Sequence, residues 1–173
     1  MKKIRPLLFL LIYTIATSAR ADFNDGVVAY LMADYDKAFT TMQSLAETSD
    51  HGYAQYYMGM MYLKGQGVDQ DYGTASNWFR KASEKNIAQA QYKLADLYFK
   101  GRGVPKDYEY AYIWYSVGAS HKHKLSEKSV KKAKNKLSDE ELKEADKVIA
   151  TYIKRYGPSE DIDPTKPIRI DNE

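Results

Sequence analysis

Apolar residues recur at helical spacing through the middle of the chain, in short segments separated by polar loops. A first segment places its apolar residues at i, i+4, i+7 and i+8, which is one face of a helix. These residues are Ala54, Met58, Met61 and Tyr62. The glycine pair in residues 64–68 ends this helix, since glycine adopts the positive φ of a helix C-terminus. Asp71 then caps a second helix, whose apolar residues are Tyr72, Ala75, Trp78, Phe79 and Ala82.

This helix–loop–helix unit occurs twice, because residues 54–86 and 90–122 align without a gap at an offset of 36 positions. Twelve of the thirty-three aligned positions are identical. In the first copy they are Ala54, Gln55, Tyr56, Tyr62, Lys64, Gly65, Gly67, Val68, Asp71, Tyr72, Ala75 and Trp78. A period in this range predicts a solenoid, in which one supersecondary unit stacks on copies of itself.

A shorter variant of the unit precedes the two full copies. Residues 22–52 predict a first helix over Phe23–Met32 and a second helix from Tyr35, joined without a glycine pair. The full units then occupy residues 53–88 and 89–123. The predicted fold class is therefore all-α.

The pattern changes after the last full unit. Residues 124–156 predict two capping helices, the first a Lys-rich helix over Ser126–Lys136. The second begins with a capping box at Ser138 and ends near Tyr156, with an apolar face that would cover the last unit. Residues 157–173 are polar and rich in proline, which predicts a flexible tail.

Residues 1–21 have the pattern of a signal peptide. A basic start precedes the apolar run Leu7–Ile15, and Ala19-Arg20-Ala21 is a small-x-small cleavage site, so we expect the mature chain to begin at Asp22. The apolar run is shorter than the ~20 residues that span a bilayer, so no transmembrane segment is expected after cleavage. The sequence predicts a periplasmic or secreted protein of a Gram-negative bacterium.

Cleavage also changes the charge. The formal charge of +3 includes four basic residues of the first 21, so 22 basic side chains then face 23 acidic ones, a net charge of −1. General affinity for nucleic acid is therefore not expected. The chain contains no cysteine, so packing alone must hold the fold, and we expect Trp78 and Trp114 in the core.

The repeat resembles the Sel1-like repeat family, which is related to the tetratricopeptide repeats. The motif is Ala-x-x-x-(Leu/Met)-(Gly/Ala)-x-x-Tyr-x-x-Gly-x-Gly-Val-x-x-Asp-Tyr-x-x-Ala-x-x-Trp, at residues 54–78 and 90–114. The resemblance covers roughly residues 22–156. It implies a right-handed α/α superhelix and a role in protein–protein interaction.

Candidate catalytic and ligand sites are weak. Some cysteine-rich members of the family have been described as penicillin-binding or β-lactamase-like, and Ser129 and Lys132 form a Ser-x-x-Lys pair. The Ser-x-Asn and Lys-Thr-Gly companions of that mechanism are missing. His121 and His123 lack a third metal ligand nearby, and we interpret them as a cationic helix C-terminus. The glycine pairs follow helices rather than strands, so the sequence predicts neither a cofactor nor a metal.

The lysines between residues 122 and 136 allow two interpretations. They could attract an acidic partner, an anionic lipid or a glycan. They could instead be the solvated face of one helix, with their charge compensated by the acidic residues at 139–144. We favour this second interpretation.

A partner would bind on the concave face, which the first helix of each unit forms. Its positions share one helical face in each unit and are mostly nonidentical between the two units. The predicted partner-binding residues are Tyr53, Tyr57, Met60, Lys64, Gln89, Lys93, Asp96 and Lys100. We expect Tyr57 and Lys93 to point away from the core of their own repeat.

The sequence thus predicts a noncatalytic, exported adaptor that binds another protein or a peptide segment. Two alternatives remain open. One is an enzyme acting on peptidoglycan or β-lactams, and the other is a structural scaffold in an envelope or flagellar assembly.

Overall fold

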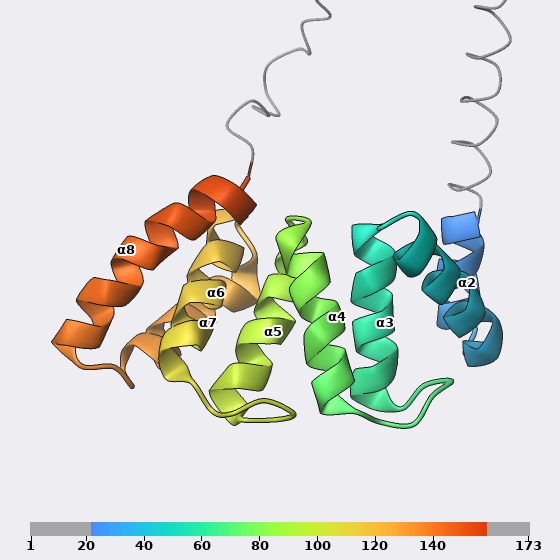
Figure 1. Cartoon of the computed structure of the whole chain (residues 1–173), viewed down its shortest axis with the longest axis horizontal. Helices are drawn as coiled ribbons and strands as arrows, with labels where there is room; N and C mark the ends of the chain where they lie inside the picture. Colours follow the sequence, from blue (N-terminus) through green and yellow to red (C-terminus); the bar gives the residue numbers. More distant parts are fainter. Residues whose placement is uncertain (1–21, 159–173) are drawn as a thin grey trace, which may run out of the picture.

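The computed structural model describes residues 22–158, and every regular element in this range is a helix (Figure 1). The expected all-α class is confirmed. The expected signal peptide and residues 159–173 of the expected tail lie outside the described residues. A first helix spans residues 22–31, and it is followed by α2 (Tyr35–Thr48), α3 (Gly52–Lys64), α4 (Tyr72–Glu84), α5 (Ala88–Lys100), α6 (Tyr108–Ser120), α7 (Lys124–Lys134) and α8 (Asp139–Tyr156).

The helices form a row in which consecutive helices from α2 to α7 pack on one another, and α8 packs on α6. α4 packs against both α3 and α5, so it joins two consecutive units. Figure 1 shows the first helix (blue) and α8 (orange-red) at opposite ends of this row. This stacking is that of a helical repeat solenoid.

The joints between units repeat more regularly than the sequence comparison suggested. Asp50, Asn86 and Lys122 are spaced 36 residues apart, and all three adopt left-handed φ values of 50°, 63° and 59°. The residue that follows each of them is the N-cap of the next helix. The same joint therefore occurs three times, including before α3, where the first unit is shortened.

The second glycine of each pair connects one unit to the unit before it. Gly67 and Gly103 have φ of 72° and 70°. A Cβ added at Gly67 would lie 2.7 Å from the carbonyl oxygen of Tyr35, and one at Gly103 would lie 2.3 Å from the carbonyl carbon of Tyr72. Only glycine fits both the backbone conformation and the close approach, so these loops fix how consecutive units stack.

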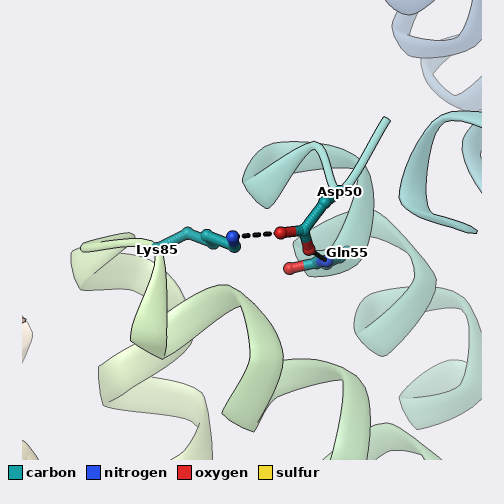
Figure 2. A network of polar contacts seen from close by, with 3 residues as sticks. All are labelled: Asp50, Gln55 and Lys85. Atoms are coloured by element: carbon teal, nitrogen blue, oxygen red, sulfur yellow. Dashed lines mark hydrogen bonds and ion pairs between the residues drawn. The ribbon is translucent and has the colours of Figure 1, made fainter. Parts of the chain in front are cut away.

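Polar contacts link the loop before α3 to the end of α4 (Figure 2). The Asp50 carboxylate accepts a hydrogen bond of 2.6 Å from Nε2 of Gln55 and forms an ion pair with Lys85. These hydrogen bonds, from Lys85 first and then Gln55, lower the pKa of Asp50. The equivalent Gln91 instead donates from Nε2 to the carbonyl oxygens of Ser83 at 3.2 Å and Tyr156 at 2.9 Å. The repeated glutamine therefore has a different role in each unit: Gln91 ties α5 to α4 and α8, whereas Gln55 holds the loop before α3.

The two repeated tryptophans differ in burial, so the expectation for Trp78 is wrong. Trp114 is 2% exposed, and its ring centroid lies 5.4 Å from that of Tyr152 and 5.7 Å from that of Tyr156 in α8. Trp78 is only half-buried, and Nζ of Lys81 lies 4.4 Å from its ring centroid. The reason is that α8 packs against α6, whereas the extensive helix contacts of α4 within residues 22–158 are those with α3 and α5.

The C-terminal helices follow the expected order, with differences in detail. α7 begins two residues before the expected Ser126, because His123 caps it by accepting the amide hydrogen of Ser126. The capping box of α8 is present, with the side chains of Ser138 and Glu141 each accepting from the other's backbone N–H. α8 packs on α6 and so covers the last full unit, as the apolar pattern predicted.

Candidate partner-binding face

The eight predicted binding residues lie on α3 and α5, and we call the surface they form the α3–α5 face. Its two ends differ in chemistry. The α3 end is aromatic and adjoins the first helix, whereas the α5 end carries charge and adjoins the start of α7.

Tyr57 at the aromatic end packs against the core of the repeat, contrary to the expectation. It is half-buried, and its ring centroid lies 5.1 Å from that of Tyr30, 6.2 Å from that of Phe23 and 5.7 Å from that of Tyr56. Tyr57 therefore holds the first helix against α3. Removing its ring would leave a cavity, so it cannot report binding separately from folding.

The remaining α3 residues are more accessible. Tyr53 is 45% exposed, with its ring centroid 6.4 Å from that of Phe23. Lys64 is exposed, and its Nζ donates to the hydroxyl of Tyr30 at 3.3 Å. Met60 is half-buried against the main core cluster. The α3 half of the face thus combines one exposed aromatic ring with one exposed cation.

The α5 half is organised around Lys93, which is half-buried. Burial is the main cause that lowers the pKa of Lys93; Asp96 opposes the shift, and repulsion from Lys64 and Lys100 adds to it. Asp96 pairs with Lys100, whose Nζ lies 2.7 Å from the carboxylate oxygen. Gln89, the last predicted residue, is exposed near the start of α5.

The structure adds aromatic neighbours that the sequence did not single out. The ring of Tyr92 lies 6.0 Å from Nζ of Lys93, and its centroid is 5.3 Å from that of His123 and 5.7 Å from that of Tyr115. Burial, and then the negative charge of Asp96, raise the pKa of the Tyr115 hydroxyl. These rings were missed because they lie outside the helical face used to select candidates; Tyr92 repeats Tyr56, and identical positions were taken as the repeated core.

His123 caps the start of α7 rather than the end of α6, so the interpretation is wrong for His123, whereas His121 is the C-cap of α6. Nδ1 of His123 accepts a hydrogen bond from the backbone N–H of Ser126, with 3.3 Å between the two nitrogens. This requires the neutral ring with its proton on Nε2. Burial lowers its pKa. The neighbouring His121 contacts the carbonyl oxygen of Tyr156 through Nε2 at 2.9 Å. Within residues 22–158 no three His, Cys, Asp or Glu side chains form a metal site.

The two residues of the Ser-x-x-Lys pair lie in different environments. Ser129 is buried in α7, beside Tyr115 of α6, whereas Lys132 is exposed. In the described range no lysine of α7 forms an ion pair with residues 139–144. The ion pairs of the described range join Lys85 with Asp50, Lys100 with Asp96, and Lys147 with Glu144, and none includes a lysine of residues 122–136.

Comparison with known proteins agrees with this geometry. The family profile described as Sel1 repeat matches residues 52–87 and 88–123. The chain is similar to the protective antigen c5321 of uropathogenic Escherichia coli, whose crystal structure displays an SLR fold, with 28% identity and a TM-score of 0.76. That alignment covers 81% of this chain and 31% of the other.

The chain belongs to the Sel1-like repeat family. A second solved relative, a Sel1 repeat protein from Oxalobacter formigenes, has 30% identity and a TM-score of 0.58, over 62% of this chain and 44% of that one. This Sel1-repeat chain therefore spans less than half the length of either relative. Comparison with curated proteins gives no significant match.

Repeats of this family typically mediate protein–protein interactions. Within residues 22–158 the longest helix is the charged α8, and none of the helices there has the length and apolarity needed to cross a membrane.

Proposed function

We propose that this Sel1-repeat protein is an exported, noncatalytic adaptor that binds a segment of a partner protein on the α3–α5 face. The observation that carries the proposal is the chemistry of that face. Its exposed members include Tyr53 and Gln89, which are equivalent positions that differ between the two units, and Lys64 and Lys100, which are a repeated lysine. A solenoid uses its repeated positions to stack its units, so variable positions on one face are available for recognition.

The continuity of the surface supports this proposal. Contacts run from the first helix to α3 through Tyr30 and Lys64, and from α5 to the start of α7 through Tyr92 and His123. Successive first helices of the units thus present neighbouring side chains. Such a surface suits an extended segment, which can contact several helices in turn.

A site-specific crosslink in intact cells tests the face. Benzoylphenylalanine replaces Tyr53, because Tyr53 is exposed and aromatic and the exchange disturbs little packing. The matched control carries the same group at Lys143, an exposed residue of α8. We expect one defined partner to be captured from position 53 and not from position 143, and Gln89→Arg in the same chain to abolish that capture.

Two results would overturn the assignment. Capture from α7, for instance from position 131, without capture from position 53 would move the site to the lysine-rich helix. Turnover of a chromogenic β-lactam that disappears in Ser129→Ala would establish an enzyme instead.

Export is proposed from residues 1–21. Its test is fractionation of cells followed by N-terminal sequencing of the accumulated protein. We expect a periplasmic or secreted chain that begins at Asp22. A cytoplasmic chain that retains residues 1–21 would refute export and leave the interaction face to be judged by the crosslink.

A further inference from the structure

The α3–α5 face holds more positive than negative charge, because the lysines at positions 64, 93 and 100 share it with a single carboxylate, Asp96. Lys93 is half-buried, and Lys64 and Lys100 are close enough to lower its pKa further by repulsion. Asp96 lies nearby but already pairs with Lys100. None of the ion pairs in residues 22–158 includes Lys93. A partly desolvated ammonium is unfavourable; Asp96 offsets part of this cost, whereas repulsion from Lys64 and Lys100 adds to it, so the packing of the fold alone does not account for a lysine here.

The repeat itself does not require a lysine at this position. The equivalent residue one unit earlier is Tyr57, whose ring packs on the first helix. Beside Lys93 the neighbouring groups are the ring of Tyr92 and the imidazole of His123, which accepts a backbone hydrogen bond through Nδ1. Neither supplies negative charge, so the ammonium of Lys93 remains available to an anion from outside the chain.

We propose that Lys93 binds a carboxylate side chain of an acidic partner segment on the α3–α5 face, where Lys64 and Lys100 add further positive charge; Tyr53, exposed on the same face, is available to an apolar residue of that segment. This inference rests on the proposed function and names the chemistry of the partner. A carboxylate relieves the repulsion among the three lysines and forms a charge-assisted hydrogen bond in a partly desolvated site. An acidic polypeptide is favoured over a membrane surface, because Lys93 is half-buried and the α3–α5 face also presents the exposed aromatic ring of Tyr53.

The test uses two synthetic probes that differ only in charge. One is an N-acetylated, C-amidated peptide with one phenylalanine and four glutamates, and the other has glutamine at all four acidic positions. Calorimetry measures affinity, and NMR of the lysine ammonium groups follows Lys93. We expect binding of the acidic peptide only, with a rise in the pKa of Lys93 on binding because the carboxylate favours its charged form.

Substitutions assign the effect to Lys93. Lys93→Gln should lower the affinity for the acidic peptide about tenfold, because one charge-assisted hydrogen bond is lost. Lys93→Arg should retain most of the affinity, because it keeps the charge and a donor. The matched control is Lys143→Gln, which removes an exposed lysine of α8 and should change nothing. Circular dichroism melts confirm that all three variants remain folded.

Equal affinity for the two peptides, or unchanged affinity in Lys93→Gln, would overturn the proposal. So would a shift of the Lys93 signals by inorganic phosphate or by phosphatidylglycerol vesicles that the acidic peptide does not produce. Crosslinking of the natural partner from position 53 distinguishes a failure of the carboxylate site from a failure of the proposed interaction face. If that capture persists in Lys93→Gln, the interaction face stands and the carboxylate site falls.

Discussion

The unequal burial of the two repeated tryptophans predicts unequal losses of stability when each is truncated. Removal of a buried tryptophan side chain costs about 3–5 kcal/mol. Trp114 is 2% exposed beneath Tyr152 and Tyr156, so we expect Trp114→Ala to lose the full amount. Trp78 is only partly buried, against the core cluster of α2 and α3 and beneath Lys81, so we expect Trp78→Ala to lose clearly less than Trp114→Ala.

Urea denaturation followed by far-UV circular dichroism measures both losses, and repeat arrays call for a check that the fluorescence transition coincides. Trp114→Phe is the control, because Nε1 of Trp114 is buried without a hydrogen-bond partner and the shorter ring keeps most of the packing. Its cost should be well below that of the alanine variant. Equal losses for Trp78→Ala and Trp114→Ala would refute the role assigned to α8 in covering α6.

Two further predictions concern the joints. Gly103→Ala should destabilise the fold by about 1–3 kcal/mol, because alanine at φ 70° is strained and its Cβ meets the backbone of Tyr72. Gly73→Ala, inside α4 and without positive φ, is the matched control and should be neutral or stabilising in the same thermal melt. Burial lowers the pKa of His123 in the folded chain below its ordinary value of 6.5. The free energy of unfolding should therefore be highest above pH 6.5 and should fall as the pH drops below that value, because the unfolded chain then binds a proton more readily. His123→Gln should flatten this part of the stability–pH curve, and an unchanged slope would show that His123 is not the group responsible.

The sequence predicted the repeated helices because their determinants are local. Apolar spacing, the caps at Asp71 and Asp107, and the glycines at 65 and 101 each act within one or two helical turns. These signals place α3 to α6 without reference to the rest of the chain. The capping box at Ser138 is local in the same way, and it marks the start of α8 correctly.

Features that depend on distant residues were not predictable. Trp78 and Trp114 occupy identical positions in the repeat, and only the path of α8 distinguishes their surroundings. Sequence comparison also cannot assign Tyr57 to the packing of the first helix, because its partners Phe23 and Tyr30 belong to the divergent unit. The joint at Asp50 was missed since left-handed residues other than glycine leave no strong signal.

The packing of Tyr57 changes how the binding face must be tested. A variant that combines Tyr57→Ala with Lys93→Glu would lose partner capture whether the partner contacts Tyr57 or not, because the first helix loses part of its packing surface. Tyr53 and Gln89 are exposed on the same face. Changes at these positions leave the cores of both units filled, so their effect on capture can be attributed to contact with the partner. Lys93 is intermediate, since its ammonium is unpaired while its aliphatic stem is partly buried, and this is why the glutamine and arginine variants are needed together.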